Sequence, residues 1–217
     1  MTHRLSHLLF AFAAFAAALS LVHASPALAQ GDRPITHAFF VAGPSFTGII
    51  DEQGQTQWAA PRTNGARDGF VLDNGHIIIT YGNEVLEFDN DKEVVWRYQL
   101  HASNGEISTA QRLDNGNTLI ATGNGHSVIE VSPDKEVVWH LAQDDLEGIR
   151  LAWVTTLQVL PNGNYVIGNC HAGPDNPQVI EVTRDKKVVW TFHDFERFGD
   201  ALSNSQVVGE DAEPYHR

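Results

Sequence analysis

Residues 108–141 read STAQRLDNGNTLIATGNGHSVIEVSPDKEVVWHL. Four short apolar runs in this stretch are separated by turns rich in Gly, Asn, Asp and Pro, a pattern typical of β-strands joined by tight connections. The same pattern recurs at residues 68–100 and 155–192. Self-similar units that each contain four strands predict a repeat protein, and the blades of a β-propeller have this composition.

The turns of the three units also agree. The first turn carries Asn-Gly each time, at 74–75, 115–116 and 162–163. Asn-Gly tolerates the positive φ of a tight hairpin, so the first two strands of each unit are expected to pair. The last strand carries Val-Val-Trp, which places Trp96, Trp139 and Trp190 at one equivalent position. We expect these large rings to pack between neighbouring units.

A fourth unit, ending at Trp58, occupies residues 37–59 but lacks a first strand. Residues 203–208 match the first strands of the other units and are expected to supply the missing one. The prediction is an all-β fold: a small β-propeller of four four-stranded blades, closed by the C-terminal strand completing the N-terminal blade. The alternative is a half-ring that pairs with a second copy to form a larger propeller.

Residues 1–29 are predicted to be a signal peptide. Arg4 precedes an apolar run over 8–22, and Ala27-Leu28-Ala29 forms a small-x-small cleavage site. The mature chain is expected to begin at Gln30, so that residues 30–217 form a single propeller domain in the periplasm or secreted, without stable membrane insertion after cleavage. An uncleaved membrane anchor is the alternative, although the apolar run is short for a span.

The charge and cysteine content of the chain limit the kinds of partner and covalent cross-link that are expected. The formal net charge of −13 argues against binding to nucleic acid or to an anionic membrane surface. The only cysteine is Cys170, which rules out an intramolecular disulfide. Its thiol is expected to be a buried small hydrophobe, with a reactive thiol or a metal ligand as alternatives.

Two segments carry a family resemblance. Residues 130–139, EVSPDKEVVW, resemble the tryptophan-ended repeat of PQQ-like (quinoprotein-like) propellers, and residues 158–167, QVLPNGNYVI, are similar to a hairpin of arylsulfotransferase-like propellers. The resemblance implies the propeller fold. Many quinoprotein dehydrogenases carry an adjacent cysteine pair beside the quinone and have larger propellers, so PQQ is not expected as a cofactor of this chain.

Candidate site residues come from one face of the predicted disc. The loops between units and those between second and third strands lie on this face and are long and variable, as binding loops are. The loops contribute four ligand-binding candidates: Arg67, Glu106, Trp153 and His171. Three glutamines at equivalent positions of the first strands are further candidates: Gln111, Gln158 and Gln206. An exposed Trp153 could stack on a sugar or an aromatic ligand.

Two functions follow from these residues. The first is an exported binding or scaffold module that holds a protein, a glycan or a small-molecule ligand. The alternative is a small periplasmic enzyme, a transferase, hydrolase or lyase of the arylsulfotransferase-like kind, with His101 and His193 at the channel mouth and Arg150 binding an anionic substrate. Imidazoles beside carboxylates also suit a divalent metal such as zinc or copper, without a defined ligand set.

Overall fold

The structure is a computed structural model that describes residues 37–62, 64–101, 105–202 and 204–209. Within these residues the chain forms fifteen strands and one short helix, α1 (Phe195–Phe198). The predicted signal peptide and Gln30 lie outside the described residues. In the described part of the chain, no helix has the length and hydrophobicity needed to cross a bilayer.

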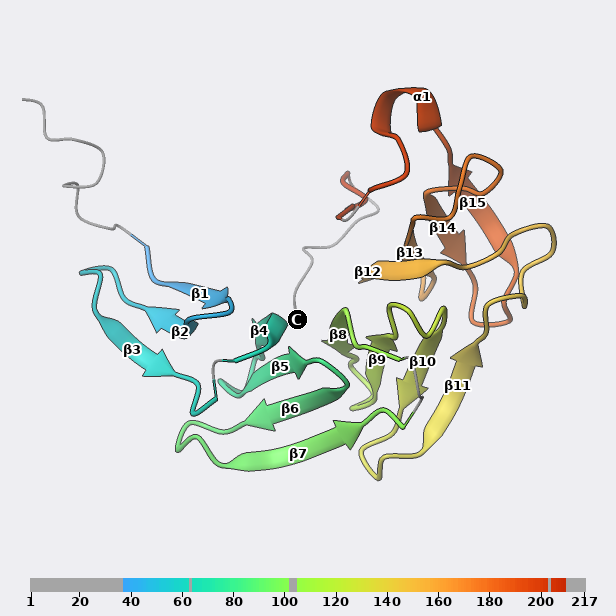
Figure 1. Cartoon of the computed structure of the whole chain (residues 1–217). Helices are drawn as coiled ribbons and strands as arrows, with labels where there is room; N and C mark the ends of the chain where they lie inside the picture. The colour runs from blue at the N-terminus through green and yellow to red at the C-terminus, as the bar shows by residue number, and fades with distance from the viewer. Residues whose placement is uncertain (1–36, 63, 102–104, 203, 210–217) are drawn as a thin grey trace, which may run out of the picture. The chain divides into compact units, whose positions relative to one another are not determined.

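The strands form four antiparallel sheets, which we call blades 1 to 4 in chain order (Figure 1). Blade 1 contains β1 (Phe39–Ala42), β2 (Thr47–Ile50) and β3 (Thr56–Ala59). Blade 2 contains β4 (Ala66–Val71), β5 (Ile77–Tyr81), β6 (Glu84–Phe88) and β7 (Val94–Gln99). Blade 3 contains β8 (Thr109–Arg112), β9 (Thr118–Ala121), β10 (Val128–Val131) and β11 (Val137–Leu141). Blade 4 contains β12 (Trp153–Val159), β13 (Tyr165–Cys170), β14 (Val179–Val182) and β15 (Val188–Phe192).

Every blade is a meander in which strands adjacent in sequence pair with each other. The first strands of neighbouring blades lie together, since β4 packs against β8 and β8 against β12. These are therefore the inner strands, and the tryptophan-bearing strands are the outer ones. The all-β class and the four repeated sheets are confirmed.

Local turn chemistry explains the hairpins. The Asn-Gly turns place Gly75, Gly116 and Gly163 at φ values of 81°, 84° and 81°, which suit glycine. The side chain of the preceding asparagine closes each turn; Asn115 Oδ1, for example, accepts a hydrogen bond from the main-chain N–H of Asn117 at 3.0 Å. The turns are therefore determined within a few residues of sequence.

Tryptophans and ion pairs join successive blades. Trp96 is 8% exposed, and its Nε1 donates to the main-chain oxygen of Pro133 in the next blade at 3.0 Å. Glu87 pairs with Arg112 of the next blade, and Glu130 with Arg184. The packing predicted for the tryptophans is confirmed for Trp58, Trp96 and Trp139, which belong to or pack on core clusters. It is wrong for Trp190, which is 44% exposed because no following blade covers it in the described structure.

The C-terminal segment, residues 204–209, lies beside β12 and is not a strand. The buried side chain of Gln158 makes two hydrogen bonds to the main chain of Val207. Its Nε2 donates to the Val207 oxygen at 3.1 Å, and its Oε1 accepts from the Val207 N–H at 2.8 Å. Blade 1 has three strands in the described residues, and the predicted pairing of residues 203–208 with β1 is not observed there. Ring closure by this segment stays a prediction.

Candidate functional site

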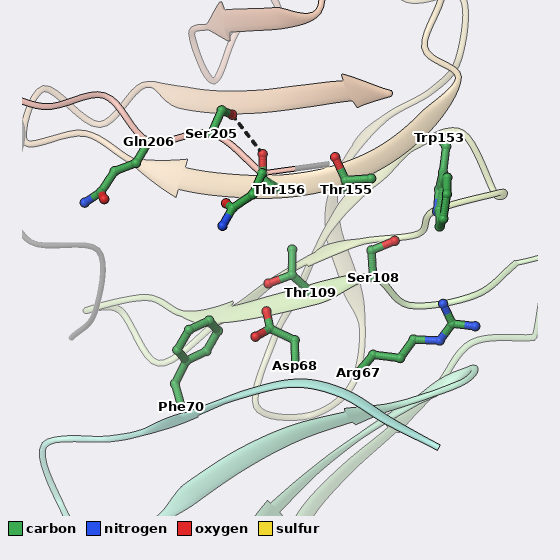
Figure 2. Close-up of a pocket in the computed structure, with 11 residues that line it drawn as sticks. Arg67, Asp68, Phe70, Ser108, Thr109, Trp153, Thr155, Thr156, Ser205 and Gln206 are labelled. Carbon is green, nitrogen blue, oxygen red and sulfur yellow. Dashed lines mark hydrogen bonds between the residues drawn. The ribbon is translucent and has the colours of Figure 1, made fainter. Parts of the chain in front are cut away.

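A cavity of about 790 Å³ opens between the inner strands of blades 2, 3 and 4 (Figure 2). β4 contributes Arg67, Asp68 and Phe70; Ser108 precedes β8, and Thr109 is its first residue. The rest of the wall comes from β12 and the C-terminal segment: Trp153, Thr155, Thr156, Asn204, Ser205 and Gln206. The volume lies in the range of small-molecule binding sites.

Most of the wall is neutral and polar. Hydroxyl groups occupy the middle of the cavity, and the hydroxyls of Thr156 and Ser205 lie 3.1 Å apart, within hydrogen-bond distance. Phe70 and Trp153 lie at opposite ends, so an aromatic ring flanks the hydroxyls on each side (Figure 2). Such a wall offers hydrogen bonds in the middle and apolar contact at both ends.

Three polar atoms of the lining residues are buried without a hydrogen-bond partner: Ser108 Oγ, Trp153 Nε1 and Thr155 Oγ1. Buried polar groups are normally paired, because leaving one unpaired costs about 1–3 kcal/mol. Half of the unpaired buried side-chain atoms in the described part of the chain belong to this wall. The unmet hydrogen-bonding capacity of the inner strands is therefore concentrated beside the cavity.

Trp153 is held by its neighbours. Its indole stacks on the imidazole of His171, with ring centroids 5.7 Å apart and planes 10° from parallel. Its Nε1 lies against Gly123, where a Cβ would approach Nε1 to 2.9 Å and Ser108 Oγ to 2.8 Å. Gly123 has a φ of 53° as well, so both its backbone and its surroundings require glycine.

The charge in the cavity is compensated. Arg67 donates to Glu106 Oε2 from Nη2 at 2.8 Å, and the second carboxylate oxygen of Glu106 lies 3.4 Å from the side-chain nitrogen of Asn124. Among the described residues of the wall, Arg67 is the one cation, and Asp68 adds a carboxylate. The wall therefore presents no net positive charge to attract an anion.

The predicted ligand-binding residues divide into two groups. Arg67, Trp153 and Gln206 line the cavity, and Glu106 and His171 support the first two of them. Gln158 is 2% exposed and holds the C-terminal segment. Gln111 lines a separate cavity of about 470 Å³ beside the Asn-Gly turns. The equivalent glutamines thus have three different surroundings and do not form one wall.

None of the predicted catalytic residues lies in the wall of the cavity. His193 is exposed and its Nε2 donates to the main-chain oxygen of Pro174 at 2.8 Å. Arg150 forms an exposed ion pair with Asp144 at 3.5 Å, and His101 is exposed at the end of blade 2. In the described residues, no group of three or more His, Cys, Asp or Glu side chains is arranged to hold a metal ion.

A set of inner-strand residues that share one register was not predicted from the sequence. They lie two positions before the glutamine column, or before Phe70 in blade 2, and all four line the cavity: Asp68, Thr109, Thr156 and Asn204. A short polar side chain at this position in four copies was the available signal. Residues i and i+2 of a strand share a face, so the short polar residues and the glutamines lie on the same side of each inner strand. The sequence alone therefore could not show which of these two sets borders the cavity.

The comparisons with known proteins concern the fold. No family model matches the chain, and no curated protein matches its sequence. Among solved structures, a streptogramin B lyase aligns at 10% identity with a TM-score of 0.54, over 72% of this chain and 55% of the lyase. The fold is that of a β-propeller.

Two further solved structures align with this propeller. Virginiamycin B lyase from Staphylococcus aureus matches at 10% identity with a TM-score of 0.53, over 70% of this chain and 50% of that chain. A protein of unknown function from Bacteroides caccae matches at 20% identity with a TM-score of 0.47, over 77% and 82%. The chain thus spans about half the length of the lyases. At these identities the likeness concerns the fold alone.

Proposed function

We propose that this propeller is an exported binding module whose inner-strand cavity takes a neutral, hydroxyl-rich ligand such as a short oligosaccharide. The observation that carries the proposal is the wall of hydroxyl and amide side chains between Trp153 and Phe70. Sugars offer hydroxyl groups around their edges and C–H surfaces on their faces. Aromatic rings stack on such faces, while the wall's hydroxyls and amides bond the edges.

Charge and unpaired atoms favour a neutral ligand over an ionic one. Arg67 is already paired with Glu106, so an anionic ligand would have to compete with a carboxylate for it. Ser108 Oγ and Thr155 Oγ1 lie buried beside the cavity with donors and acceptors unused. A small rotation of these hydroxyls toward a polyol would satisfy them without bringing a charge into the site.

The predicted catalytic residues give the enzyme alternative less support, because none of them lines the cavity. General acid–base catalysis needs a titratable group within hydrogen-bond reach of the bound substrate. His193 and Arg150 instead bind the loop that follows β13, since the main-chain N–H of Arg150 donates to Asn176 Oδ1 at 2.8 Å. The similarity to lyases lies at the level of fold, and a fold does not determine an activity.

Titration calorimetry of the mature protein against neutral cello-, malto- and chito-oligosaccharides tests the proposal. We expect saturable binding to at least one series and a loss of roughly tenfold or more in affinity in Trp153→Ala. Phe198→Ala is the matched control, because Phe198 is an aromatic residue of α1 that is 44% exposed and outside the cavity wall. Absence of binding throughout, or equal affinity of Trp153→Ala and wild type, would refute the proposal.

Export is tested separately. The proposal rests on the charged start, apolar run and cleavage site of residues 1–29. Expression of the full chain in a bacterium should deposit in the periplasm or medium a protein whose N-terminal sequencing begins at Gln30. A full-length chain retained in the cytoplasm contradicts export and leaves the ligand proposal to its own test.

A further inference from the structure

The junction of blades 2 and 3 and the junction of blades 3 and 4 are built in the same way. A tryptophan of the outer strand packs on the following blade, where its Nε1 meets the turn between the third and fourth strands. At the junction of blades 3 and 4, Trp139 contacts the Tyr165 ring edge-on at a centroid distance of 5.1 Å and donates to the main-chain oxygen of Arg184 at 2.7 Å. Trp96 uses Pro133 in the same way.

Blade 4 carries the same tryptophan without a following blade. Trp190 faces Glu181 across β14 and β15, as Trp139 faces Glu130 across β10 and β11. Trp190 is nevertheless 44% exposed, whereas Trp58 and Trp96 are each 8% exposed. Blade 4 therefore has the tryptophan and the strand register of a junction surface, but no blade packs on that surface in the described structure.

Blade 1 carries the complementary surface. All residues of β5, β9 and β13 are buried, whereas the equivalent strand β1 alternates between exposed and half-buried residues. Phe39 is 44% exposed, and its pairing with Ile50 matches that of Tyr165 with Val182. In the turn between β2 and β3, Glu52 occupies the position of Arg184, so its main-chain oxygen is the equivalent acceptor.

The C-terminal segment lies where the inner strand of a following blade would lie. Asn204, Ser205 and Gln206 share a cavity wall with β4, β8 and β12. Blade 1 is the blade that lacks an inner strand in the described residues. Blade 1 therefore complements blade 4 in three ways. It offers an apolar face to Trp190, its turn between β2 and β3 offers the hydrogen-bond acceptor, and the C-terminal segment can take the place of its inner strand.

We infer that blade 4 docks blade 1 of a second copy of this chain, so that two chains build one propeller, with Trp190 of one copy packed on Phe39 of the other. A second copy is favoured because blade 1 of the same chain does not cover this surface in the described structure: Trp190 and Phe39 are each 44% exposed, while β1 packs on β4 of blade 2. Two copies related by a two-fold axis bury both pairs of open ends and close the ring.

Sedimentation equilibrium of the mature protein tests the inference. We expect twice the mass of one chain and a roughly 30-fold or greater weakening of association in Trp190→Asp and in Phe39→Asp, since each buries a carboxylate in an apolar contact. Val138→Asp is the control: Val138 is 49% exposed on β11, away from both surfaces. Circular dichroism verifies that all three variants fold. A monomeric wild type, or a dimer that Trp190→Asp leaves unchanged, overturns the inference.

Disulfide trapping identifies the partner. Phe39→Cys and Trp190→Cys are made as two separate proteins, mixed and oxidised, with Cys170 replaced by Ala in both. A covalent dimer that forms from the mixture and from neither protein alone supports docking between copies. If instead the double variant forms an internal disulfide and stays monomeric, blade 1 of the same chain covers blade 4, and the inference is wrong.

Discussion

The indole Nε1 of Trp139 donates a hydrogen bond to the main-chain oxygen of Arg184, 2.7 Å away, across the junction of blades 3 and 4. The bond satisfies a main-chain acceptor in a turn and fixes the rotation of the indole, so that the tryptophan orients the next blade as well as filling space. The same bond recurs between Trp96 and Pro133 at the junction of blades 2 and 3.

Replacing Trp139 by Phe should therefore cost more than the same change at Trp58. Both changes shorten a ring at a junction, but Trp58 Nε1 is buried without a hydrogen-bond partner, so removing it loses no bond. We expect Trp139→Phe to lower the free energy of unfolding by about 1 kcal/mol more than Trp58→Phe does. Urea denaturation of both variants measures the difference, and equal losses would mean that the Trp139 bond contributes nothing.

Glu130 should make stability depend on pH. Burial raises the pKa of its carboxyl group, but hydrogen bonds from Arg184, Asn117 and Tyr165 outweigh burial and hold the pKa below its ordinary value of 4.5. A carboxylate with a depressed folded-state pKa stabilises the protein above its unfolded pKa, and this contribution is lost as the pH falls through the folded value. Stability should thus decrease as the pH falls below about 5.

Glu130→Gln should flatten this dependence and cost about 2–4 kcal/mol at neutral pH, because Arg184 loses a buried partner. Glu181→Gln is the matched control. Glu181 occupies the same position in blade 4 and accepts a 2.7 Å hydrogen bond from Asn164, which glutamine can retain. Urea denaturation from neutral to acid pH provides the comparison; a Glu130→Gln protein with the wild-type pH profile would assign the dependence to other groups.

Gly123→Ala should damage the cavity wall. The new Cβ would lie 2.8 Å from Ser108 Oγ and 2.9 Å from Trp153 Nε1, in addition to the strain of a φ of 53°. Gly82→Ala isolates the strain, since Gly82 has a φ of 52° and nothing within 4 Å of the added carbon. We expect about 1 kcal/mol of destabilisation for Gly82→Ala and about 2–4 kcal/mol for Gly123→Ala.

Trp153 fluorescence provides a second readout for this pair, since only the change at Gly123 should shift its emission. Similar destabilisation and unchanged emission in both variants would mean that the residues around Gly123 move aside for the added methyl group without further loss of stability.

Gln158→Leu should release the C-terminal segment. The substitution keeps the buried volume but removes both hydrogen bonds to the main chain of Val207. We expect amide hydrogen exchange in residues 204–209 to become about tenfold faster, which corresponds to a loss of about 1.4 kcal/mol. Gln111→Leu, at the equivalent position of blade 3, should leave this exchange unchanged, and unaltered exchange in Gln158→Leu would show that other contacts hold the segment.

The hairpins could be predicted from the sequence almost residue by residue. Asn-Gly at 115–116 was expected to join two strands, and it joins β8 to β9. Positive φ at glycine and a closing asparagine side chain act within four residues, so this information is local. The repeat itself then implied that each unit is a separate sheet.

The cavity wall could be predicted only in part. Arg67 and Trp153, two of the predicted ligand-binding residues, line the cavity, whereas Gln158, another of them, is buried against the C-terminal segment. Thr109 and Thr156 belong to a repeated column of short polar residues, but their place beside the cavity was not predicted. Which inner-strand side chains face the cavity depends on how closely the inner strands of three blades approach one another. The spacing between blades cannot be read from the sequence of a single repeat.

Trp139 and Trp190 illustrate where the two kinds of information divide. Both end the same Val-Val-Trp strand, and from the sequence alone they are the same residue of the same repeat. The sequence by itself determined the strands, the turns and the junction surface, because backbone preferences and side-chain alternation act over a few residues. Only the tertiary structure decided that Trp139 is covered and Trp190 is 44% exposed, because burial depends on the neighbouring blade that a residue meets.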